Sequence, residues 1–81
     1  MQIGTVTGNV WSTKRIEGMP HAALLRVELE SGGCLIAVDV IGSGVGEQVI
    51  ITQGSVAAAW FDGASPPVDA LIVGSIDPTS G

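Results

Sequence analysis

Two apolar runs separated by a glycine-rich loop constrain the fold of this 81-residue chain more than any other feature. The runs cover residues 35–38 and 49–51, and Gly42, Gly44 and Gly46 lie between them. Glycine tolerates positive φ and the close approach of another backbone, so the loop can turn sharply or lie against a neighbouring chain. Because β-branched residues follow the loop, this stretch predicts a strand, a loop and a second strand.

The alternating glycines match phosphate-binding loops only superficially. Those loops open a helix whose N-terminus holds the phosphate, and they carry Lys-Ser/Thr or a third glycine at a different offset. In this chain Glu47 and a β-branched run follow Gly46, and no lysine is placed to meet a phosphate. A nucleotide site is therefore not expected.

Size and composition predict a single domain, residues 1–81, that associates with copies of itself. A domain this small buries only about 60% of the surface of its unfolded chain. Cys34 has no second cysteine to pair with, and one histidine with one cysteine is too few for a closed zinc site. Since 46% of the residues are hydrophobic and 14% are charged, we expect other copies to cover part of the surface.

Charge and hydropathy exclude two classes of partner. No run approaches the ~20 apolar residues of a membrane helix, and no secretory signal is visible, so we expect a cytosolic protein. The net charge is −5, with Lys14, Arg15 and Arg26 as the permanent cations. This balance argues against binding the phosphate backbone of a nucleic acid.

Short strands separated by turn signals account for the rest of the chain. Leu25, Val27 and Leu29 alternate with charged residues, which indicates a strand with one buried face. Gly4 and Gly8 interrupt the first strand, as bends or bulges do in curved strands. The expected strands cover residues 1–13, 25–30, 34–39, 48–52 and 68–76, with a hairpin turn at 31–33.

A helical turn is expected after the fourth strand. Three consecutive alanines favour a helix over residues 56–60, with Ser55 as its cap. Loops are expected at 14–21 and 62–67, and a frayed tail at 79–81. The last strand is apolar on both faces, which requires a closed barrel or a neighbouring subunit. The predicted fold class is therefore mainly β: a small five-stranded, OB-like barrel with one short helical turn.

Three stretches, taken together, resemble the EutN/CcmL family of microcompartment vertex proteins. Residues 1–14 read Met-x-Ile-Gly-x-Val-x-Gly-x-Val-Trp-x-Thr-Lys. Residues 37–57 contain Ala-Val-Asp, Ile-Gly-Ser-Gly-Val-Gly-Glu and Gly-Ser, and residues 67–77 contain Pro-Val-Asp-Ala and Ile-Val-Gly-x-Ile-Asp. The stretches follow the order and spacing of the family and span nearly the whole chain.

The resemblance implies a barrel that assembles as a homopentamer. Such pentamers cap the vertices of bacterial microcompartments, carboxysomes among them, while hexameric shell proteins form the facets. It implies a structural protein in the shell, with no cofactor, no metal and no catalytic activity. The chain departs from the family in having Ser43 where relatives often have alanine, and Ala58 where many have arginine. Interface arguments that depend on that arginine do not transfer.

Two groups of residues are candidates for assembly. We expect the glycine loop to lie near a five-fold axis, where side chains would not fit; a tight turn without an axial role is the alternative. Glu47 either points toward that axis, where five carboxylates would repel one another, or is a solvated loop residue. Trp60 and Phe61 are candidates for a subunit interface, where tryptophan often supplies much of the binding energy. The residues expected near the axis are Gly42, Ser43, Gly44, Val45, Gly46 and Glu47.

Functions of other classes have weaker support. His21 and Cys34 would need an orienting group and a cleft to act as a base and a nucleophile. Carboxylates at Asp39, Glu47, Asp69 and Asp77 suit turn hydrogen bonds better than acid–base chemistry. The alternative function is a small OB-like module that binds nucleic acid or oligosaccharide, with bases stacked on the aromatic residues, but a basic groove is missing.

Overall fold

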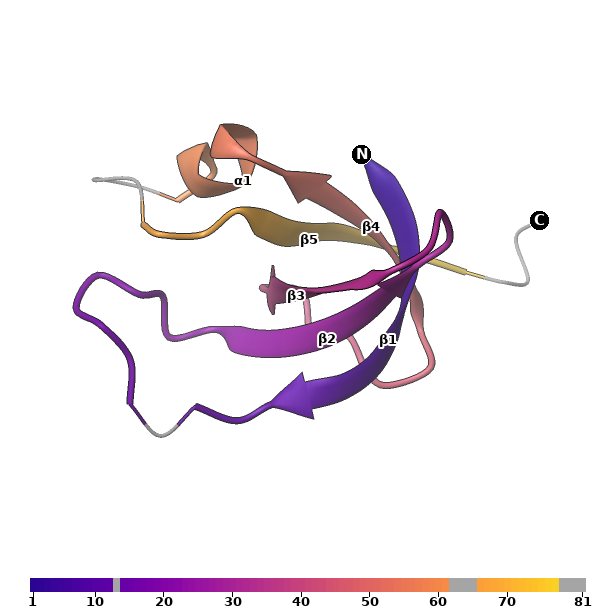
Figure 1. Ribbon diagram of the computed structural model, residues 1–81, viewed down its shortest axis with the longest axis horizontal. Helices are drawn as coiled ribbons and strands as arrows, with labels where there is room; N and C mark the ends of the chain where they lie inside the picture. The colour runs from indigo at the N-terminus through magenta and orange to yellow at the C-terminus, as the bar shows by residue number, and fades with distance from the viewer. Residues whose placement is uncertain (13, 62–65, 78–81) are drawn as a thin grey trace.

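Five strands close into a barrel in the order β1-β2-β3-β5-β4 (Figure 1). The computed structural model describes residues 1–12, 14–61 and 66–77. The short helix α1 (Ser55–Ala59) joins β4 to β5. The strands are β1 (Gln2–Val10), β2 (Ala23–Leu29), β3 (Cys34–Asp39), β4 (Gln48–Gln53) and β5 (Ala70–Ile76). The expected five-stranded barrel with one helical turn is confirmed.

The two glycines of the first strand have different surroundings in the pairing of β1 with β2. The register shifts between Val6 and Gly8, which confirms the predicted irregularity of a curved strand. Gly4 has a different role. A Cβ atom at this position would lie 2.5 Å from Val27 Cγ1 and 2.8 Å from the Glu28 carbonyl oxygen. A side chain at position 4 would therefore clash with β2.

Inward-facing residues of the five strands fill the barrel. Alternation along β2 buries Leu25 and Val27 and leaves Arg26 and Glu28 in water, as predicted. Branched apolar side chains dominate this core, which suits the pleated surface of a strand. Its buried members are Val6, Leu25, Val27, Ala37, Val49, Ile51, Ala70 and Ile72.

A second apolar cluster lies outside the barrel, beneath α1. Its buried residues are Val38, Ala57, Val68 and Leu71. Leu71 belongs to this cluster while its neighbour Ile72 belongs to the barrel core, so the first half of β5 is covered on both faces, whereas Val73 is exposed. This covering explains why the first half of the last strand is apolar on both faces. Partly buried side chains that pack against the cluster are Met19, Ala22, Leu24 and Phe61.

Several element boundaries differ from the sequence-based prediction. β1 ends at Val10, short of the expected residue 13, and β2 starts at Ala23, two residues before the expected Leu25. Two further differences have a structural explanation. Gly54, with φ 78°, is the N-cap of α1 and makes no side-chain cap hydrogen bond, so the predicted Ser55 cap is wrong. The last strand starts at Ala70 because Val68 packs into the second cluster, and its amide donates to the Pro66 carbonyl at 2.8 Å. The expected loop residues 62–65 and tail residues 79–81 lie outside the described residues. Among the described residues, none of the helices has the length and apolar character needed to span a membrane.

Candidate functional site

The segment 40–47, here called the glycine loop, joins β3 directly to β4 (Figure 1). Gly42 and Gly46 have φ of 85° and 93°, the left-handed region that favours glycine. Backbone hydrogen bonds tie the end of the loop to β1: the Val6 amide donates to the Glu47 carbonyl at 2.9 Å, and the Gly46 amide donates to the Val6 carbonyl at 2.8 Å. The predicted strand, loop and strand are confirmed.

Gly44 differs from the other two glycines of the loop. It is not among the residues with positive φ. A Cβ atom at this position would meet Glu47 Oε1 at 3.5 Å, an ordinary van der Waals contact. The conformation of a single subunit therefore does not require glycine at position 44.

Asp39 holds the first half of the glycine loop. Its side chain is only 6% exposed, at the end of β3. The carboxylate accepts hydrogen bonds from the Ile41 amide at 3.2 Å and from the Ser43 amide at 2.7 Å. The Ser43 hydroxyl donates a third bond at 3.2 Å, so the serine that departs from the family pattern adds a contact. The expected turn hydrogen bonds at this aspartate are confirmed.

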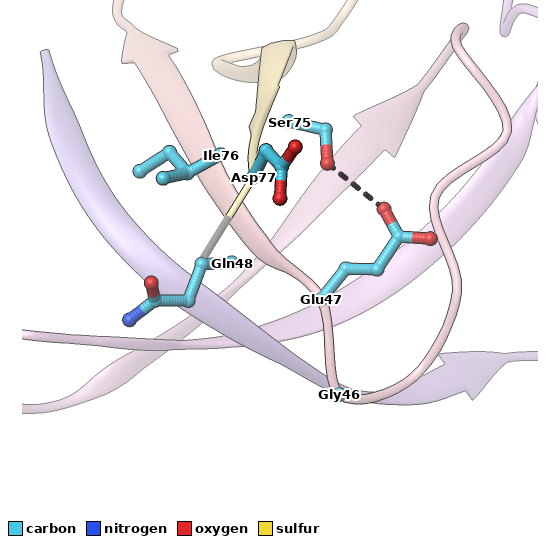
Figure 2. Close-up of a pocket in the computed structure, with 6 residues that line it drawn as sticks. All are labelled: Gly46, Glu47, Gln48, Ser75, Ile76 and Asp77. Atoms are coloured by element: carbon cyan, nitrogen blue, oxygen red, sulfur yellow. Dashed lines mark hydrogen bonds between the residues drawn. The ribbon is translucent and has the colours of Figure 1, made fainter. Parts of the chain in front are cut away.

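Glu47 holds the second half of the loop within its own subunit. Oε1 accepts from the Gly44 amide at 3.1 Å, and Oε2 accepts from the Ser75 hydroxyl at 3.0 Å, the bond drawn in Figure 2. Ser75 belongs to β5, so the side chain connects the loop to a strand that is distant in sequence. The two carboxylates of the site thus accept bonds within the subunit. An open groove of about 750 Å³ lies here, lined by Gly46, Glu47, Gln48, Ser75, Ile76 and Asp77.

Large apolar side chains are exposed on the glycine loop and on α1. Val45 is 63% exposed, and Ile41 and Val40 are also exposed. On α1 and the residue after it, Val56 and Trp60 are exposed, with Trp60 at 59%. These exposed apolar side chains lie on two separate elements, and each group would lose water contact if a neighbouring subunit covered it.

The two candidate interface aromatics differ in environment. Phe61 is partly buried and packs against the second apolar cluster. Its ring meets Trp60 edge-on, with centroids 5.2 Å apart and planes at 88°. Such edge-to-face contacts are favourable and fix the relative orientation of two rings. Phe61 thus supports the exposed indole from within the subunit.

The residues considered for catalysis are not brought together. Cys34 lies opposite Glu28 in the register of β2 and β3, at the end of β2. His21 precedes the start of β2, so the two residues are separated by the length of this strand, about 15 to 20 Å. Cys34 is exposed and accepts a hydrogen bond from Arg26 Nη2 at 3.4 Å, which raises the pKa of Arg26. In the part of the chain that the structure describes, no three His, Cys, Asp or Glu residues gather as metal ligands would.

The basic residues do not form a nucleic-acid surface. Arg15 Nη1 donates to the Pro20 carbonyl at 2.7 Å and to the Ala22 carbonyl at 3.0 Å, so this guanidinium fixes the loop before β2. Arg26 lies on the outer face of β2 beside Glu28. Binding of single-stranded nucleic acid needs a continuous basic groove, which the three permanent cations of the chain, Lys14, Arg15 and Arg26, are too few to line.

Comparison with known proteins places this barrel in a family. The family model described as "Ethanolamine utilisation protein EutN/carboxysome" matches residues 1–77. The microcompartment shell vertex protein EutN of Escherichia coli K12 is 36% identical over 83 residues, covering 95% of this chain and 87% of EutN.

Two solved structures resemble the chain closely. The pentameric shell protein MSM0273 from the RMM microcompartment has 63% identity and a TM-score of 0.93, over 100% of this chain and 95% of MSM0273. The pentameric shell protein GrpN from Rhodospirillum rubrum has 36% identity and a TM-score of 0.81, over 95% of each chain. The chain therefore belongs to the EutN/CcmL family and is a structural protein of the microcompartment shell vertex class.

Proposed function

We propose that five copies of this chain form a closed ring that caps a vertex of a bacterial microcompartment shell. The observation that carries this proposal is the 63% identity, over the whole chain, with a pentameric shell protein. The exposed apolar residues of the glycine loop and α1 also support it, because they need a covering partner. Native mass spectrometry tests the ring directly. A species of about 41 kDa, five times the 8.2 kDa chain, is expected, and a stable monomer at micromolar concentration would contradict the proposal.

A ring of five needs two different patches on each subunit. In a head-to-tail interface, one patch of each copy contacts the other patch of its neighbour. Exposed apolar residues occur on two separate elements, the glycine loop and α1, which is compatible with such an interface. We propose that Trp60 contributes to the second patch, with Phe61 holding its ring in place.

We further propose that the glycine loop lies near the five-fold axis of the ring. The residues from Gly42 to Glu47 would then crowd against four copies of themselves. Gly44 supports this placement, because neither its φ nor its surroundings explain a glycine within one subunit. Crowding by neighbouring loops would explain it. A tight turn with no axial role is the alternative.

The substitution Gly44→Ala separates these two possibilities. Within a subunit the added methyl group finds ordinary contacts, so the free energy of unfolding is expected to change by less than about 0.5 kcal/mol. In the ring the methyl group is repeated five times around the axis. We expect at least a tenfold increase in the concentration at which the pentamer dissociates, measured by native mass spectrometry of a dilution series.

Gly42→Ala is the matched control for this experiment. Gly42 has φ 85°, so alanine there strains the backbone by roughly 1 kcal/mol or more, whether or not the ring forms. Both subunit stability and assembly should therefore weaken in Gly42→Ala. A Gly44→Ala protein with wild-type dissociation would show that the loop is not crowded at an axis.

The remaining parts of the proposal concern partners and chemistry. We propose that the ring contacts hexameric shell proteins along its rim, that it resides in the shell within the cytoplasm, and that it catalyses no reaction. The separation of His21 from Cys34 supports the absence of a nucleophile–base pair. Co-expression with a hexameric shell protein tests the partnership: closed shells are expected with this chain present, and open sheets or unsealed shells without it.

A further inference from the structure

We infer that Asp39 and Glu47 are positioning residues that preform the glycine loop in each subunit before the ring closes. The inference rests on the proposed pentamer and concerns how its loop is prepared. A loop of this length that contains three glycines can adopt many conformations. Ordering it during assembly would cost conformational entropy. Something within the subunit must therefore order it beforehand if assembly is to be efficient.

Several backbone amides of the loop find their acceptors inside the subunit. Those of Ile41 and Ser43 donate to the Asp39 carboxylate. The Gly44 amide donates to the Glu47 carboxylate, and the Gly46 amide donates to the Val6 carbonyl. Successive N–H groups left free in such a turn would form a concave anion site. Here two carboxylates of the same chain take that place.

The same contacts connect the loop to the two strands that flank β4, the strand that follows the loop. β4 lies between β1 and β5 in the barrel. The loop bonds to β1 through Val6 and to β5 through the contact of Glu47 with Ser75, as Figure 2 shows for the latter. Since these two strands flank β4, their contacts restrain both tilt and translation of the loop.

A carboxylate is the side chain that this arrangement requires. Asp39 is buried and meets three donors, two amides and a hydroxyl. Asparagine has the same shape but offers one oxygen, and its NH₂ group would face another donor. Glutamine at position 47 can accept from Gly44, but the Ser75 hydroxyl would have to turn and accept from its NH₂ group, and both bonds would lose the charge that strengthens them.

The variants Asp39→Asn and Glu47→Gln, measured by hydrogen–deuterium exchange, test the inference. Hydrogen bonds to charged groups are strong enough that losing one should accelerate exchange of the peptide spanning residues 40–48 by about 10- to 100-fold. Peptides from β2 and β3 should exchange at the wild-type rate in Glu47→Gln. Ser75→Ala removes only the link to β5 and should give a smaller acceleration in the same peptide.

Glu30→Gln is the matched control, because it removes one negative charge from an exposed carboxylate in the turn after β2. It should leave both loop exchange and assembly unchanged. Glu47→Gln should also raise the dissociation concentration of the pentamer at least tenfold, since the loosened loop must be ordered during assembly. Glu47 is exposed, so this variant folds even if the buried Asp39→Asn variant does not.

The outcomes distinguish this inference from the proposed function. Unchanged loop exchange in both variants would overturn it. A faster-exchanging loop in a ring of wild-type stability would overturn the link to assembly. A wild-type protein that is monomeric would instead contradict the proposed pentamer, while exchange of its loop would still report on the two carboxylates.

Discussion

Alanine in place of Gly4 is expected to destabilise the subunit by about 2 to 3 kcal/mol, the cost typical of overpacking a filled site. Its Cβ atom would overlap Val27 Cγ1 and the Glu28 carbonyl oxygen, both under 3 Å away. The carbonyl belongs to the backbone of β2 and cannot rotate aside, so the two strands must separate. In a domain of this size the melting temperature should fall by roughly 10 °C or more.

Gly8→Ala provides the control for this prediction. Gly8 lies on the same strand, but a Cβ atom there would meet nothing within 4 Å. Its melting temperature should stay within about 3 °C of the wild type, compared at equal protein concentration because assembly adds to apparent stability. Equal effects of the two substitutions would show that strand propensity, rather than the contact with β2, governs position 4.

Truncation of Trp60 to alanine is expected to have the largest effect on assembly. Tryptophans at interface centres commonly contribute 2 kcal/mol or more, and a ring of five would lose this amount five times, about 10 kcal/mol in total. We therefore expect Trp60→Ala to be mostly dissociated at micromolar concentration in native mass spectrometry. Far-ultraviolet circular dichroism should still report a folded barrel, because the indole is mostly exposed.

The conservative variant Trp60→Phe separates an interface role from loss of the contact with Phe61. A phenyl ring can keep the edge-on contact with Phe61 and part of the apolar area, so assembly should be partly restored. A Trp60→Ala protein that remains a wild-type-like pentamer would assign the indole to a surface other than the ring interface.

Much of the barrel could be predicted because local signals agree with tertiary packing. The β3 bounds of Cys34–Asp39 match the expectation, since a glycine pair precedes the strand and the glycine loop follows it. Gly32 and Gly33 both have positive φ, as the predicted hairpin turn requires. Where turn residues punctuate both ends of an apolar run, its limits can be read from the chain.

The start of the last strand could not be predicted because its determinant is tertiary. Val68 continues the apolar pattern of β5, so periodicity alone assigns it to the strand. Its side chain instead joins Val38 and Ala57 in the cluster outside the barrel. The start of α1 was missed for a related reason: Ser55 is a good capping residue, but the positive φ of Gly54 begins the helix one residue earlier.

The candidate site was predicted in outline only. Nothing in the sequence distinguishes the three alternating glycines, whereas in the structure Gly44 differs from Gly42 and Gly46 in its backbone conformation. Turn hydrogen bonds were expected at the acidic residues, and Asp39 makes them. The partnership of Glu47 with Ser75 left no local signal, because 28 residues separate them and only barrel closure brings them together.

The closed barrel also affects how an apolar chain avoids uncontrolled aggregation. Each of the five strands has a strand on either side, so the sheet has no edge strand. Edge strands are templates for pairing with other chains and for growth of fibrils. With backbone pairing satisfied internally, association must proceed through side chains, whose shapes select a particular neighbour. A chain so rich in apolar residues can in this way form finite assemblies rather than open-ended ones.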